Sequence, residues 1–138
     1  DSFADGSCPM ETLDDTSIAY VANYFQVLSE PMRLKLINAL RAGERNVGEL
    51  SAQFGCSTAN VSKHLGLLAK SGFVERQTRG NCVYYRIADP AIFDLCELVC
   101  GQVGRRLAAQ VETASQLVGL QAQRSASAKP APRSKNEK

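Results

Sequence analysis

The sequence predicts a mainly α fold (α+β) with about five helices and one β-hairpin, and three patterns carry this prediction. Residues 57–72 repeat apolar side chains at the four-then-three spacing of an amphipathic helix, directly after a short helical segment and a turn. Residues 73–87 change to the looser alternation of a hairpin. Residues 91–120 then return to a helical rhythm that is long for a domain of this size.

The composition is that of one globular domain. The chain has 138 residues, of which 44% are hydrophobic, and this suffices for a small core. We expect a flexible N-terminal arm at residues 1–12, a folded domain at 13–121 and a disordered basic tail at 122–138. No apolar run reaches the length of a membrane span and no signal-peptide pattern is present, so we expect a cytoplasmic protein without a membrane partner.

Charge is unevenly distributed along a chain whose net charge is only +2. Residues 1–30 contain six acidic side chains and no Lys or Arg, whereas residues 45–86 contain six cations against two acids. Such a local excess of cations indicates a binding surface for a polyanion.

The elements before residue 44 are two predicted helices. In the first, at residues 13–28, Asp14 and Asp15 favour the N-terminus through the helix dipole. Its apolar face comprises Ile18, Val21, Ala22, Phe25 and Leu28. Pro31 suits the first turn of the second helix, and Gly43 suits its end. The expected core residues of this second helix are Leu34, Ile37 and either Leu40 or Leu36.

Residues 45–72 have the pattern of a helix-turn-helix. A short extended segment at 45–47 leads into a brief helix at 47–54, and Gly55 and Cys56 form the turn. Ser57 is a suitable N-cap for the next helix, and Gly72 is a suitable stop. The apolar stripe of this helix comprises Val61, Leu65 and Leu68.

The other face of the helix at 57–72 is small, polar and basic. Such side chains suit the donors and acceptors of a DNA major groove better than they suit burial. The alternative is an ordinary solvated surface. We expect this face to point outward and to contact DNA through Ser57, Thr58, Asn60, Ser62, Lys63 and His64.

A β-hairpin with a basic tip follows. Residues 73–78 and 82–87 are its expected strands, and residues 79–81 have turn chemistry. Considered alone, this pattern would indicate only a structural hairpin at the edge of a sheet. Beside a helix-turn-helix it is a wing, whose cations meet phosphate or the minor groove. The expected contacts are Arg76, Arg79 and Arg86, and the predicted fold is a winged helix-turn-helix.

The last helix is predicted to begin after Asp89 and Pro90 and to keep one apolar face to about residue 120. We expect this face, together with the N-terminal helix, to pack against a second copy of the chain in a symmetric homodimer. It comprises Ile92, Leu95, Val99, Val103, Leu107, Val111, Ala114 and Leu117.

Three stretches of the sequence resemble the ArsR/SmtB family of winged-helix repressors. Residues 25–34, FQVLSEPMRL, resemble the family's "LadptRl" stretch. Residues 49–68 resemble its helix-turn-helix, including the S-x-H-L core, and residues 71–74 and 79–87 resemble its "aGLV…G…vyY" wing. The similarity extends over about residues 17–120. It implies a homodimeric repressor that binds an imperfect inverted repeat in double-stranded operator DNA, needs no cofactor for binding and is released by an inducer.

Most residues that form the known sensor sites of this family are missing from this sequence. The family's zinc site on the C-terminal helix needs Asp and His residues, and the only histidine is His64, on the predicted DNA-reading helix. Its thiolate site on the first helix of the helix-turn-helix needs cysteines, and residues 47–54 contain none. Its persulfide-sensing pair needs a cysteine in the second helix, where Asn38 stands.

Cys96 and Cys100 are the remaining sensor candidates. Four residues apart on one helix, they share a face, and thiolates prefer soft, thiophilic ions. Cys8 is the best candidate for a third thiolate, which would complete a three-sulfur site for the inducers As(III) or Sb(III). Cys56 and Cys82 lie in the DNA-reading half of the chain.

Other roles for the cysteine pair stay open. Cadmium and lead also suit a three-sulfur site. Thiol redox or persulfide sensing is a further alternative, although a disulfide within one helix would be strained. The pair can also simply pack in a helix interface. An enzyme is not expected, because no C-x-x-C accompanies a βαβ pattern and no Gly-rich phosphate loop is present.

Overall fold

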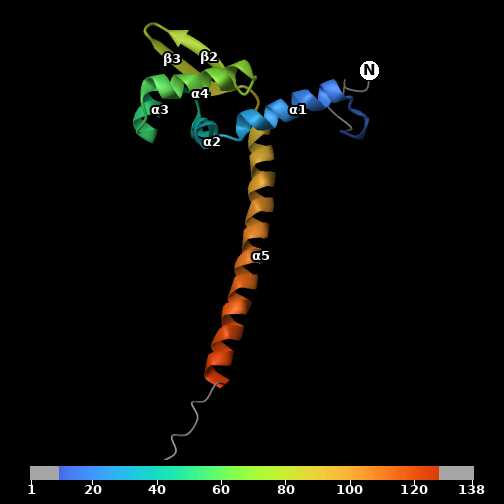
Figure 1. Cartoon of the computed structure of the whole chain (residues 1–138). Coiled ribbons are helices and arrows are strands. Elements are labelled where there is room, and N and C mark those ends of the chain that lie inside the picture. Colours follow the sequence, from blue (N-terminus) through green and yellow to red (C-terminus); the bar gives the residue numbers. More distant parts are fainter. Residues whose placement is uncertain (1–9, 128–138) are drawn as a thin grey trace, which may run out of the picture. The chain divides into compact units, whose positions relative to one another are not determined.

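A computed structural model describes residues 10–127 and confirms the predicted winged helix-turn-helix (Figure 1). The chain divides into two compact units at residue 93, so α5 begins in the first unit and continues through the second. The elements in chain order are η1 (Met10–Thr12), α1 (Asp15–Leu28), α2 (Pro31–Ala39), η2 (Leu40–Ala42), β1 (Arg45–Asn46), α3 (Val47–Phe54), α4 (Thr58–Lys70), β2 (Val74–Arg79), β3 (Cys82–Ile87) and α5 (Ala91–Ser127).

Side-chain caps begin each of the first four α-helices. Asp14 Oδ1 accepts a hydrogen bond from the amide of Ser17 at 2.8 Å, and this bond holds the pKa of Asp14 below its ordinary value of 3.8. Glu30, Asn46 and Ser57 cap α2, α3 and α4 in the same way, which satisfies amides that the helix itself leaves free. The predicted N-cap at Ser57 is therefore confirmed.

The wing is a three-stranded antiparallel sheet in the order β1-β3-β2, with one strand more than predicted. The added strand, β1, is the short extended segment predicted before the helix-turn-helix, and it pairs Arg45 with Tyr85. β2 and β3 pair along their whole length, with Arg79 opposite Cys82 beside the turn. Gly80 lies in that turn with a φ of 59°, a left-handed conformation that a side chain would strain.

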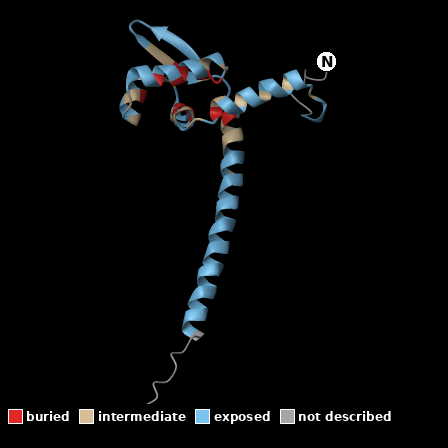
Figure 2. Ribbon diagram, in the orientation of Figure 1, coloured by how far each residue is buried: buried red, intermediate tan, exposed pale blue. Residues whose placement is uncertain are grey.

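The core of the first unit lies where α4 contacts α2 and α3, and Figure 2 shows the buried residues on these helices in red. Its α4 members are the predicted ones, Val61, Leu65 and Leu68, each with no exposed surface. From α2 and the following turn come Leu36, Ile37 and Leu40. Leu34 is 43% exposed, so its prediction as a core residue is wrong. At about 100° per residue, Leu34 lies roughly 160° from Leu36 around the helix and roughly 60° from Ile37, so it falls outside the buried arc of α2.

α5 is one helix of 37 residues, about 55 Å long at 1.5 Å per residue. It continues to Ser127, beyond the predicted end near residue 120, because residues 121–126 contain no glycine or proline to stop it. The first residues of the predicted disordered tail are therefore helical, and Met10–Thr12 of the predicted arm form η1. Residues 1–9 and 128–138 lie outside the described residues. Between residues 10 and 127, no helix combines the length and apolarity needed to cross a membrane.

Apolar side chains remain exposed on α1 and on α5, each considered within its own unit. On α1, Leu28 is buried, whereas Ile18 and Phe25 of the predicted face are 40% and 50% exposed. On α5, six apolar residues with exposures between 46% and 64% fall on one face by helical spacing. They are Val99, Val103, Leu107, Val111, Leu117 and Val118.

Candidate nucleic-acid interface

α4 presents most of its predicted DNA-reading face to solvent. The apolar stripe is buried on the opposite side of the helix, so the polar face points away from the core. Apart from one lysine, the side chains of this face are short, which allows the helix to approach base edges closely. The exposed members of the predicted set are Ser57, Thr58, Asn60, Ser62 and Lys63.

His64 is the exception, and the prediction that it faces outward is wrong. Its side chain is only 11% exposed. Its Nδ1 lies 3.3 Å from Nη1 of Arg33 and 3.7 Å from Oε2 of Glu30. The physical reason is helical geometry, because a residue three after Val61 and one before Leu65 lies beside the apolar stripe. His64 therefore does not belong to the exposed face of α4.

The three predicted wing arginines are all exposed but differ in their partners. Arg86 forms a salt bridge with Glu75 at 2.7 Å. Arg79 forms one with Glu44 at 2.6 Å, and its guanidinium carbon lies 4.8 Å from the centre of the Tyr84 ring. Arg76 has no salt bridge among the described residues. Its full charge is therefore available to an external anion.

A hollow of about 450 Å³ separates α4 from the wing. Small side chains of α4 form one wall, and Arg76 on β2 contributes the positive charge. An exposed hollow that is lined on one side by small residues and carries one guanidinium without a salt bridge to any described residue suits the backbone of a nucleic-acid strand. Its lining residues are Val47, Ser62, Gly66, Ala69, Arg76, Val83 and Tyr85.

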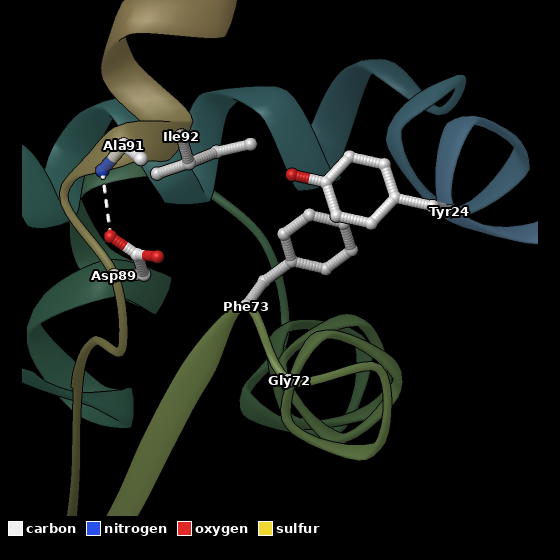
Figure 3. Close-up of a pocket in the computed structure, with 6 residues that line it drawn as sticks. All are labelled: Tyr24, Gly72, Phe73, Asp89, Ala91 and Ile92. Carbon is white, nitrogen blue, oxygen red and sulfur yellow. Dashed lines mark hydrogen bonds between the residues drawn. The ribbon is translucent and has the colours of Figure 1, made fainter. Parts of the chain in front are cut away.

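A second, smaller cavity of about 190 Å³ lies at the beginning of α5, within the first unit (Figure 3). The rings of Tyr24 and Phe73 meet there with centroids 4.4 Å apart, and Ile92 packs beside them. Asp89 accepts a hydrogen bond from the amide of Ala91 at 3.0 Å. The carboxylate thus caps α5, and the cavity lies between α1, the turn before β2 and the first residues of α5.

The cysteine candidates lie on α5, where Cys96 is half-buried and Cys100 is exposed. Their spacing places them about one turn apart on one side of the helix. Cys8, the predicted third ligand, lies outside the described residues. Within residues 10–127 no three His, Cys, Asp or Glu side chains come together as a metal site. Cys56 and Cys82 lie elsewhere, in the helix-turn-helix and at the wing tip.

Sequence reasoning missed three residues that hold this interface together. Glu30 and Arg33 contact His64, and Glu44 contacts Arg79. The partners in each contact are more than thirty residues apart in the sequence, so no periodic pattern marks them. The one sequence signal that could have pointed to Glu30 and Arg33 is their position in residues 25–34, the stretch that resembles the family.

Comparison with known sequences supports the structural assignment. Residues 30–76 match the family described as "Bacterial regulatory protein, arsR family". The chain is 36% identical over 91 residues to the uncharacterised HTH-type transcriptional regulator Rv0081 of Mycobacterium tuberculosis, covering 65% of this chain and 75% of the relative. It is also 36% identical over 77 residues to a probable mercury resistance operon repressor of Streptomyces lividans, covering 56% of this chain and 62% of that protein.

Solved structures give the same result. The crystal structure of Rv0081 superposes with a TM-score of 0.65 at 30% identity and covers 72% of this chain and 99% of that one. A homodimeric winged helix-turn-helix DNA-binding domain from Mycobacterium bovis gives 0.60 at 30% identity, with 71% and 94% covered. The antimony-specific transcriptional repressor AntR gives 0.59 at 29% identity, with 72% and 97% covered.

Proposed function

The chain belongs to the ArsR family of bacterial regulatory proteins, and from that membership we propose that it represses transcription by binding an operator as a homodimer. It is a transcriptional regulator and not an enzyme. The observation that carries the proposal is the exposed polar face of α4 beside a basic wing. In this arrangement the short polar side chains of α4 read the major groove, while Lys63, Arg76 and the wing tip contact phosphates.

Exposed apolar faces on α1 and α5 support the homodimer. Ile18 and Phe25 on α1 and the six-residue face of α5 are more exposed than is usual for a monomer. A second copy of the chain covers such faces, and a two-fold dimer presents two copies of α4 to the two halves of an imperfect inverted repeat.

Operator binding is tested by its dependence on salt. We expect Lys63→Ala and Arg76→Ala each to weaken binding and to lower the slope of log affinity against log salt by about two, because each copy in the dimer loses one phosphate contact. The measurement is fluorescence anisotropy with duplex fragments from upstream of the protein's own gene. Arg86→Ala is the matched control, since Glu75 already neutralises Arg86, and its slope should change less. Binding that ignores salt in the unaltered protein would exclude DNA as the partner.

For the inducer, we propose As(III) or Sb(III), bound by the thiolates of Cys96 and Cys100 with Cys8 as the third ligand. The four-residue spacing on α5 supports this, because two sulfurs on one helix face can share a soft ion. Similarity to repressors named for antimony and mercury supports a thiophilic inducer in general. Cadmium or lead, and thiol oxidation or persulfide formation, are the alternative signals for the same pair.

Removing the pair is expected to abolish induction without abolishing repression. Sb(III) should lower the operator affinity of the reduced protein by about 5- to 150-fold, the usual range of coupling between two sites. A variant with Cys96→Ser and Cys100→Ser should bind the operator normally and ignore Sb(III). The control, Cys56→Ser with Cys82→Ser, should respond fully.

The same titration distinguishes the proposed inducer from the alternative signals. Sulfur coordination counted by X-ray absorption, with and without Cys8→Ser, tests the third ligand. A full Sb(III) response after loss of Cys96 and Cys100 would remove the pair from the mechanism. A response to cadmium, lead or an oxidant alone would select the corresponding alternative.

A further inference from the structure

A hydrogen-bonded cluster joins α1, α2 and α4 beneath the exposed face of α4. Arg33 on α2 is at its centre. Its Nε donates to the carbonyl of Val27 in the last turn of α1 at 2.6 Å, and its Nη1 lies 3.3 Å from Nδ1 of His64 on α4. Glu30, the cap of α2, accepts from the amide of Arg33 at 3.1 Å and lies 3.7 Å from the same ring nitrogen.

The contact with Arg33 assigns Nδ1 of His64 as a hydrogen-bond acceptor. A guanidinium has donors only, so a hydrogen bond from Nη1 requires a lone pair on Nδ1 of the imidazole. We therefore expect the ring to carry its hydrogen on Nε2 and not on Nδ1. An imidazolium would point a second donor at Arg33 and lose the bond.

The cluster restricts the orientation of α4, which its apolar packing on the core leaves less tightly defined. Val61, Leu65 and Leu68 attach α4 to the core by apolar burial, which depends on area and tolerates small rotations about the helix axis. A hydrogen bond from a side chain that is itself tied to α1 restricts both distance and angle. Its acceptor, His64, directly follows Lys63 on the exposed face, so it sets the rotation at which that face meets a groove.

We propose that His64 is a positioning residue for DNA recognition: through Arg33 it holds the rotation of α4, and it makes no contact with DNA itself. The inference rests on the proposed operator binding and deepens it. Burial supports positioning over contact, since the side chain of His64 is only 11% exposed. The cluster also connects α4 to α1, one of the two helices assigned to the dimer.

Two substitutions of His64 distinguish the effect of its hydrogen bond with Arg33 from the effect of its side-chain volume. In His64→Asn, the side-chain oxygen takes nearly the place of Nδ1 and still accepts from Arg33, whereas His64→Leu fills the space without an acceptor. We expect His64→Leu to lose about tenfold to hundredfold in operator affinity, and His64→Asn to stay within about threefold of the unaltered protein. Because no phosphate contact is lost, both should keep the full salt slope.

Two results of this comparison would overturn the proposal. One is unchanged operator affinity in a folded His64→Leu protein, because the hydrogen bond would then position nothing that matters for binding. The other is a salt slope lowered by about two in either variant, because His64 would then be a phosphate contact in each copy. Thermal unfolding and size-exclusion chromatography of each variant check that fold and assembly are retained.

A spectroscopic measurement tests the cluster without any substitution. The ¹⁵N shifts of the single histidine ring in the full chain at neutral pH should show a neutral ring with its hydrogen on Nε2. Arg33→Lys, which keeps the charge but changes the donor geometry, should move the Nδ1 shift. A hydrogen on Nδ1, or an imidazolium, would contradict the proposal. This result does not depend on DNA, so it stays decisive even if the protein fails to bind an operator.

Discussion

Replacing Leu65 with alanine is expected to lower the free energy of unfolding by about 2–5 kcal/mol, a large part of the total stability of a domain of this size. Leu65 has no exposed surface and lies between the two other buried residues of the α4 stripe. Its truncation leaves a cavity where α4 contacts α2 and α3, which partial relaxation fills poorly. Urea unfolding followed by circular dichroism measures the loss.

The matched control for this substitution lies two residues further along the same helix. Leu67 is 39% exposed, so Leu67→Ala removes the same atoms from a site that leaves no closed cavity. We expect it to cost under about 1 kcal/mol. Equal losses for the two variants would mean that α4 is held by its helix propensity rather than by its buried stripe, contrary to the observed packing.

A charge placed in the apolar face of α5 is expected to produce monomers and to remove tight operator binding. Val103→Glu with Leu107→Glu puts two carboxylates on neighbouring turns of that face. If two copies pair through this face, both carboxylates become buried without partners, and the free-energy cost of burying them opposes dimer formation. A monomer binds one half-site alone and loses the gain from linked sites, about 100-fold or more in affinity.

Light scattering after size-exclusion chromatography measures the assembly, and anisotropy measures operator affinity. Ala109→Glu with Gln116→Glu adds the same charge to the opposite side of α5 and should leave both unchanged. A double variant of the apolar face that remains dimeric would place the dimer contact elsewhere, with the exposed face of α1 as the remaining candidate.

Local patterns were sufficient to predict most of the fold. The stripe of α4, the cap at Ser57 and the helix begun after Pro90 depend on residues within a few positions of one another, and all were predicted. Leu34 was misplaced because α2 carries leucines on two sides, and only packing against α4 decides which side is buried.

The interface was predicted less completely because its decisive contacts are long-range. His64 lies at the edge of the apolar stripe, where periodicity alone does not distinguish inside from outside. Its burial depends on Arg33, which lies 31 positions earlier. The pairing of Arg79 with Glu44 spans 35 positions. For Cys96 and Cys100, the missing information is the position of Cys8 and of a second copy, which no local pattern contains.

The carboxylates beside Arg79 and Arg86 have a consequence for how the protein distinguishes its target from the rest of the chromosome. Affinity for arbitrary duplex comes almost entirely from unpaired cations, and two of the three wing arginines already have a protein partner. We therefore expect the occupancy of random sites to be low. If α4 reads base edges as proposed, discrimination then depends on those contacts, and the protein should dwell at its operator and not at the many competing sequences around it.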